Sequence, residues 1–69
     1  MQIGASIPGM VSKLNVSVGD EVEENRTLAI IEAMKMETAV TAPCAGRVKE
    51  ILVSAGQAVK AGELLIVLE

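Results

Sequence analysis

The strongest constraint on this chain is that its two halves repeat one pattern. With an offset of 37 residues, PGMVSKLNVSVGDEVEENRTLAIIE lies over AGRVKEILVSAGQAVKAGELLIVLE. Two copies are too few to stack as a solenoid. We therefore expect one domain, residues 1–69, with repeats at about 5–32 and 42–69 that pack together about a pseudo-two-fold axis. The matched pairs include Gly9/Gly46, Val11/Val48, Gly19/Gly56, Val22/Val59 and Leu28/Leu65.

Each half has the pattern of short strands separated by turns. Apolar residues alternate at Leu14, Val16 and Val18, and the following Gly19-Asp20 is typical of a tight turn. Most of the large apolar residues are valine, isoleucine or leucine, and β-branched side chains favour strands. The pattern predicts an all-β fold, a flattened barrel or sandwich, with few or no helices.

Two irregularities recur at equivalent places in the halves. Val11 and Leu14 are three residues apart, which breaks the period of two, and the second half repeats this break. A β-bulge in each half would restore the alternation and bend the strand. Asn25 and Gly62 also coincide under the offset. Because both residue types tolerate positive φ, we expect a left-handed turn residue at each position.

The segment LAIIEAMKMETA conflicts with an all-β interpretation, because its composition favours a helix. The repeat favours strands instead, since LAIIE aligns with the apolar segment that ends the chain. A short helix without a clear N-cap is also marginal by itself. We therefore predict strands at Leu28–Ala33 and Met36–Thr41, joined by the two-residue turn Met34-Lys35.

Met34-Lys35 is an unfavourable sequence for such a turn. The preferred type I′ geometry needs positive φ at both positions, which suits Asn-Gly and costs other residues about 1–3 kcal/mol. A residue pair that departs from the local turn preference, in a sequence that otherwise agrees with its fold, indicates a functional position. We expect Lys35 to project into solvent from the hairpin tip with Met34 and Met36 partly exposed beside it. Glu32 and Glu37 should face each other across the strands.

The composition excludes several functional classes. The chain has no histidine, no motif for a serine or cysteine nucleophile and no phosphate-binding glycine loop, so we do not expect an active site. A net charge of −3, scattered basic residues and the absence of aromatic residues argue against nucleic-acid binding. No apolar run approaches the roughly 18 residues of a membrane span.

Cys44 is the single cysteine, so no intrachain disulfide can form, and no set of metal ligands is present. We expect its side chain to fill a buried or half-buried gap in the packing. One unpaired thiol fits a reducing, cytoplasmic setting.

The residues EAMKMET, Glu32 to Thr38, resemble the attachment motif of biotinyl carrier domains, in which the lysine of Ala-Met-Lys-Met is joined to biotin by an amide. The similarity extends over nearly the whole chain: ASIPGMV and VSVGDEV resemble the first half of the family, TAPCAGRVKEILVSAGQAV the second, and GELLIVLE the last strand. The chain is most similar to the C-terminal carrier domains of pyruvate carboxylases.

The resemblance implies a barrel-sandwich hybrid of two four-stranded antiparallel sheets, with the chain termini at the end opposite the hairpin. It also implies covalent biotin on Lys35, with Ala33, Met34 and Met36 completing the motif that biotin protein ligase recognises. Such a domain is a monomeric, non-catalytic carrier. It moves carboxybiotin between the biotin carboxylase and carboxyltransferase active sites.

Two alternatives remain open at this point. A lipoyl carrier domain of a 2-oxo acid dehydrogenase complex has a similar architecture and a hairpin lysine, although that lysine usually has acidic and alanine neighbours. An unmodified lipoyl-like module of an adaptor protein is the other alternative. In such proteins a helical hairpin separates the two halves, whereas here KMETAVTA joins them directly.

Overall fold

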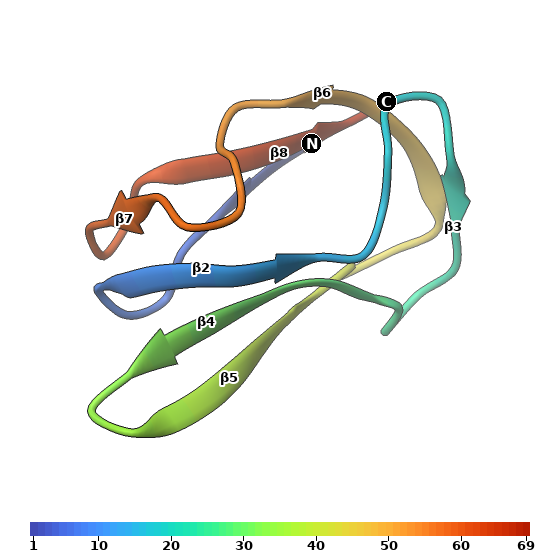
Figure 1. Cartoon of the computed structure of the whole chain (residues 1–69). Helices are drawn as coiled ribbons and strands as arrows, with labels where there is room; N and C mark the ends of the chain where they lie inside the picture. The colour runs from blue at the N-terminus through green and yellow to red at the C-terminus, as the bar shows by residue number, and fades with distance from the viewer.

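The computed structural model describes residues 1–69 as eight strands without a helix (Figure 1). All strand pairs are antiparallel, and they form two four-stranded sheets that pack face to face. The predicted fold class is therefore confirmed. The strands are β1 (Gln2–Gly4), β2 (Gly9–Leu14), β3 (Glu21–Val22), β4 (Thr27–Ala33), β5 (Met36–Thr41), β6 (Gly46–Ile51), β7 (Ala58–Val59) and β8 (Leu64–Leu68).

The sheets obey the pseudo-two-fold relation that the repeat predicts. We call the sheet with strand order β1-β8-β6-β3 sheet A and the one with order β5-β4-β2-β7 sheet B. The offset of 37 residues converts the first order into the second, strand by strand. Backbone hydrogen bonds repeat as well: the Ala5 N–H donates to the Glu63 carbonyl and the Ala42 N–H to the Arg26 carbonyl, both at 2.9 Å.

The core lies between the two sheets and consists of 16 buried residues, all hydrophobic. Equivalent positions are buried alike, as Leu28 and Leu65 both have 0% exposure. Each sheet covers the apolar face of the other, and each sheet takes two strands from each half of the chain, so the two halves share one core. The largest fully buried side chains are Leu28, Ile31, Leu65, Ile66, Leu68, Val11 and Val48.

The predicted irregularities are present in both halves. The pairing of β2 with β4 shifts register between Val11 and Lys13, and that of β6 with β8 shifts between Val48 and Glu50. These shifts are the β-bulges that restore the inward alternation and bend the strands around the core. The left-handed turn residues are also confirmed, since φ is 71° at Asn25. At Gly62, its equivalent, φ is 84°.

The sequence-based prediction of a strand that extends to Val18 is wrong. Strand β2 ends at Leu14, and Val18 is 63% exposed. The backbone N–H of Ser17 donates to Oδ2 of Asp20 at 2.8 Å, while the Asp20 N–H donates back to the Ser17 carbonyl at 3.0 Å. This local turn competes with the sheet for the backbone groups, so the chain leaves the sheet before Val18.

The prediction of a buried or half-buried Cys44 is also wrong, because its side chain is exposed. Ala42, which is fully buried, is the last core residue before the chain leaves the sheet. The following Pro43–Ala45 loop then runs over the surface, where Cys44 Sγ lies 3.7 Å from Met1 Sδ.

The chain termini lie together at the end of the sandwich away from the β4–β5 hairpin (Figure 1). The Leu68 N–H donates to the Met1 carbonyl at 2.7 Å. The termini thus occupy the place in sheet A that corresponds to the hairpin in sheet B. The structure contains no helix with the length and hydropathy required to cross a lipid bilayer.

Candidate functional site

The candidate site is the tip of the hairpin formed by β4 and β5. Its register pairs Ile31 with Thr38, Glu32 with Glu37 and Ala33 with Met36, which leaves a two-residue turn. The predicted hairpin is therefore confirmed, including the facing carboxylates. The helix that propensity favours does not form. The segment instead forms the inner strand β4 and the start of the edge strand β5 of sheet B, and both strands contribute buried residues to the core.

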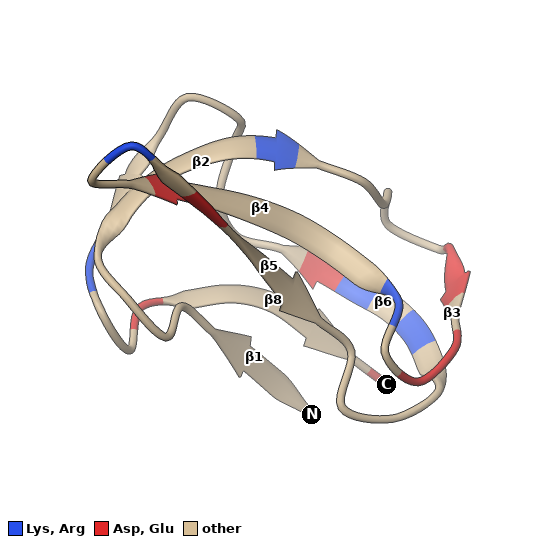
Figure 2. Cartoon of the chain, turned by 90° about the horizontal axis from the view of Figure 1, so that it is seen from below, with Lys and Arg blue, Asp and Glu red and all other residues tan.

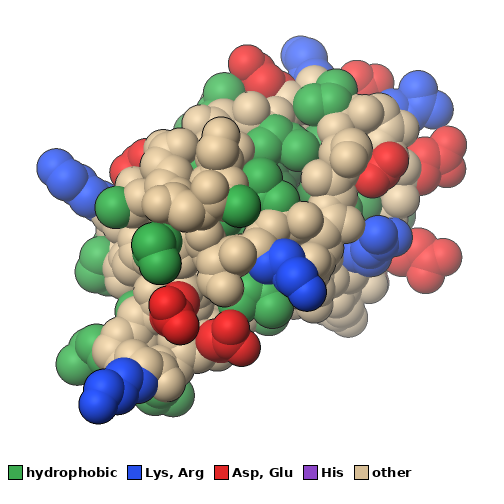
Figure 3. Space-filling view, viewed as in Figure 1, with side chains coloured by type: hydrophobic (Ala, Val, Ile, Leu, Met, Phe, Trp, Pro, Cys, Tyr) green, Lys and Arg blue, Asp and Glu red, His purple; other side chains and the backbone are tan.

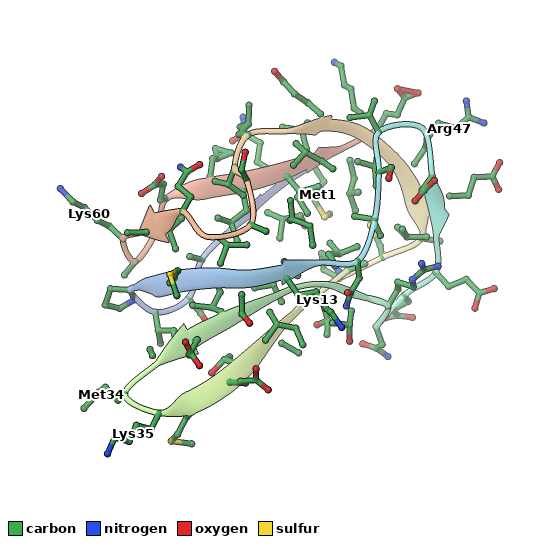
Figure 4. The ribbon with its side chains drawn as sticks, in the orientation of Figure 1. Met1, Lys13, Met34, Lys35, Arg47 and Lys60 are labelled. Carbon is green, nitrogen blue, oxygen red and sulfur yellow. The ribbon has the colours of Figure 1, made fainter.

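The turn residues adopt the conformation that their types disfavour. φ is 52° at Met34 and 65° at Lys35, as type I′ geometry requires. Their side chains consequently point away from the sandwich, and Met34 is 94% exposed. Figure 4 shows Lys35 extending outward from the tip. Met36 is 68% exposed, so both methionines are accessible to a partner.

The base of the hairpin is held firmly although its tip is free. Strand β4 lies between β5 and β2 and contributes the buried Ile31 to the core. Gly9, at the start of β2, approaches it very closely: a Cβ built there would lie 2.5 Å from the Glu32 carbonyl oxygen. The repeat marks Gly9 as structural through its match with Gly46, but only the tertiary contact shows that it braces the hairpin.

The charges around the tip are mixed. Figure 2 shows acidic residues on β4 and β5 immediately behind the basic residue of the turn. The structure's only salt bridge lies elsewhere, between Arg47 and Glu21, so no ion pair holds the Lys35 amine. The ammonium can therefore move freely over its flexible stem, in front of the facing carboxylates of Glu32 and Glu37.

Neither groove of the surface is lined by residues of the hairpin tip. No three His, Cys, Asp or Glu side chains gather in a way that could hold a metal ion. The larger of two grooves has a volume of about 880 Å³ and lies at the β3 end, among Glu21, Glu23, Arg26 and Arg47. No hairpin-tip residue lines it. What the hairpin tip provides is the exposed amine of Lys35 on a rigid β support.

A small all-β domain that presents a lysine on a hairpin tip is typical of carriers of a covalently attached group. The model of a family described as biotin-requiring enzymes matches residues 2–68. The chain belongs to this family of biotin-requiring enzymes, and its cofactor is covalently attached biotin.

The relatives of this chain include a carboxylase and a biotin carboxyl carrier protein. The chain is 48% identical over 67 residues to pyruvate carboxylase of Staphylococcus aureus, a match that covers 97% of the chain and 6% of the relative. It is 53% identical over 62 residues to the biotin carboxyl carrier protein of Streptococcus mutans, covering 90% of the chain and 48% of the relative. It thus spans less than half of each relative.

Two solved structures share the fold. Urea carboxylase of Kluyveromyces lactis superposes with a TM-score of 0.93 and 38% identity, over 100% of this chain and 6% of that one. A single-chain, multi-domain long-chain acyl-CoA carboxylase gives 0.91 and 32%, over 96% and 7%. These relationships favour a biotin carrier over the lipoyl and unmodified alternatives, and they identify the domain as a non-catalytic module.

Proposed function

We propose that Nζ of Lys35 is joined to biotin by an amide, and that the domain is the carboxyl carrier of a biotin-dependent carboxylase. The observation that supports this most directly is the position of Lys35 at the tip of the β4–β5 hairpin, between two exposed methionines. The residues fit the cofactor, because nothing in the structure covers the amine or ties it down.

The geometry suits transfer between separate active sites. The lysine stem and the attached group form one long tether with many rotatable bonds, and a tether keeps the attached group at a high effective concentration near its targets. Strands β4 and β2 keep the base of this tether fixed relative to the domain. Biotin, when attached, accepts a carboxyl group at one active site and releases it at another.

Attachment requires a second enzyme, because an ammonium has no lone pair with which to attack a carbonyl. We propose that a biotin protein ligase supplies an activated biotinyl donor and a base that removes the proton. The nitrogen then forms the amide bond as the activating group leaves. The modification removes one positive charge, so the formal net charge changes from −3 to −4. Ala33, Met34 and Met36 are the proposed recognition residues around Lys35.

We propose pyruvate carboxylase as the parent enzyme, with biotin carboxylase and carboxyltransferase domains as partners. The 48% identity to the Staphylococcus aureus enzyme over 97% of the chain supports this choice. The test is to add the biotinylated domain in trans to the separated catalytic domains of that enzyme. Carboxylation of pyruvate is expected, whereas transfer only to an acyl-CoA by a propionyl-CoA carboxylase would contradict this parent.

The attachment site is tested by coexpressing the domain with biotin protein ligase and measuring its intact mass and its binding to avidin. The wild-type domain should gain one biotinyl group. Lys35→Arg should fold normally and gain none, because a guanidinium does not form this amide. Lys60→Arg, which changes another exposed lysine, is the matched control and should label fully. A label that persists in Lys35→Arg, or a lipoyl adduct on the wild type, would refute the proposal.

A further inference from the structure

The turn Met34-Lys35 is the only covalent connection between two equal parts of the fold. Residues 1–33 form β1 to β4, and residues 36–69 form β5 to β8. Each part contributes eight of the 16 core residues. Four of the six strand pairs join one part to the other, namely β1–β8, β2–β7, β3–β6 and β4–β5. The core therefore closes only when both parts are present.

This single connection is also where the backbone is strained. φ is positive at both Met34 and Lys35, a region that favours glycine and asparagine. The third non-glycine residue with positive φ is Asn25, whose side-chain type tolerates it. An extended strand that ran straight through residues 34 and 35 would return both to negative φ. Opening the turn would therefore release strain rather than create it.

The space beyond the turn is open. Met34 and Lys35 are both exposed and point outward from the end of the hairpin (Figure 4). Figure 3 shows this end as a narrow projection of the molecular surface. A second folded unit can therefore lie beyond the tip without displacing any strand of the first.

We propose that two copies of this chain exchange residues 36–69 and form a domain-swapped dimer, with Met34-Lys35 as the hinge. In the dimer β4 continues into β5 as one strand, and each β5 pairs with β4 of the second copy. All four strand pairs between the parts form again with the same residues, so each unit has a complete core. This inference is independent of biotin attachment.

The balance between the two forms follows from what differs between them. The dimer has the contacts of two monomers but lacks the strain of two turns, and short connections under strain favour exchange. The monomer is favoured because its two parts are tethered to each other, whereas the dimer must bring two chains together. The dimer is therefore expected at high concentration.

The first test is to unfold the 69-residue chain in urea and refold it at two concentrations, with mass measured by light scattering after size exclusion. Refolding at about 1 mM, comparable to the effective concentration that a short tether provides, should give dimer, and refolding at a concentration about a hundredfold lower should give monomer. The isolated dimer should dissociate slowly on dilution, because both cores must open before the parts can return.

Substitutions at the hinge should move the equilibrium in opposite directions. Met34→Asn should raise the dissociation constant of the dimer about thirtyfold, because the gain of asparagine in the closed turn counts twice for each dimer. Met34→Val should lower the dissociation constant, because a β-branched residue fits an extended strand and not positive φ. Met36→Asn is the matched control: residue 36 lies within β5 in both forms, so its dissociation constant should match the wild type.

A disulfide distinguishes exchange from association of closed monomers. Glu32 and Glu37 lie directly opposite each other on β4 and β5, and the Cα separation of such pairs, about 4.5–5.5 Å, is one that a disulfide spans. Glu32→Cys/Glu37→Cys, made with Cys44→Ser, should link one chain to itself in the oxidised monomer. In the oxidised dimer it should link two chains, which then remain together in SDS without reductant.

Three results would overturn the exchange. The first is an oxidised dimer that runs as single chains in SDS, because the two copies would then associate through their surfaces. The second is the absence of dimer at high concentration in both the wild type and Met34→Val. The third is an equal dissociation constant for Met34→Asn and the wild type, because the turn would then not act as a strained hinge. Failure of Lys35 to accept biotin would refute the proposed function and leave this inference standing.

Discussion

Gly9 lies so close to Glu32 that a Cβ at residue 9 would stand 2.5 Å from the Glu32 carbonyl oxygen and 2.8 Å from Cγ2 of Ile31. Both contacted residues belong to β4, just before the turn that bears Lys35. The position of the hairpin therefore depends on the absence of a side chain in a neighbouring strand. No feature of the hairpin sequence itself shows this dependence.

Gly9→Ala should destabilise the domain by about 1–3 kcal/mol, because either β2 or the base of the hairpin must move to admit the methyl group. Thermal unfolding should show a midpoint lowered by at least about 4 °C. Gly46→Ala is the pseudo-symmetric control: its Cβ would lie 2.9 Å from the carbonyl oxygen of the terminal residue Glu69. That residue can move more easily, so its loss should be smaller. Equal unfolding of Gly9→Ala and wild type would contradict the bracing role.

Met34→Asn should stabilise the domain by about 1 kcal/mol, because asparagine tolerates the φ of 52° that methionine adopts at a cost. Urea unfolding measures the gain. The same variant should be biotinylated more slowly, since it lacks one of the proposed recognition side chains. Met36→Asn is a useful comparison, because residue 36 lies within β5, where asparagine should not stabilise. If Met34→Asn proved less stable than wild type, strain in the turn would be excluded.

Leu28→Ala and Leu65→Ala should each lower the free energy of unfolding by about 2–5 kcal/mol, and by similar amounts. Both side chains have 0% exposure and occupy equivalent positions in the core. Because a domain of this size has only about 3–10 kcal/mol in total, either variant should be marginally folded at room temperature. Circular dichroism with denaturant titration measures both losses. A large difference between them would show that the two halves do not share the core equally.

Arg47→Met and Glu21→Ala should each change the free energy of unfolding by less than about 1 kcal/mol, because exposed ion pairs are weak. The 3.4 Å pair is exposed to solvent on both sides, and added salt should reduce its contribution further. Thermal unfolding at low and high ionic strength is the measurement. A loss of several kcal/mol would show instead that the ion pair is needed for folding.

Much of the fold could be predicted from the repeat, because patterns that recur at a fixed offset must serve the same structural purpose. The bulges after Val11 and Val48 and the left-handed residue at Asn25 followed from this comparison and are confirmed. The strand assignment of β4 and β5 also depended on it, since propensity by itself favours a helix there. The hairpin tip and its Lys35 followed from the assignment.

Both errors lie where the chain leaves a sheet. Val18 continues the apolar alternation, yet a local turn between Ser17 and Asp20 takes the chain out of the sheet. Cys44 has the residue type of a buried position, yet it follows the last core residue of its segment and lies in a surface loop. At Ser17–Asp20 local hydrogen bonds compete with sheet pairing, whereas Cys44 is exposed because the chain has already left the sheet. The polarity of a residue and its place in an alternating pattern do not show where the chain leaves the sheet.

The sequence by itself determined the two-fold design, the strands and the residue at the tip of the hairpin, because these depend on patterns within each half and on the matching of one half to the other. Only the tertiary structure decided how firmly the hairpin is braced and which exposed residues lie beside it. Gly9 meets β4, and Met10 shares a row with Glu32, because strands distant in the sequence become neighbours in sheet B. Such contacts arise when the halves close over one core, which no single segment specifies.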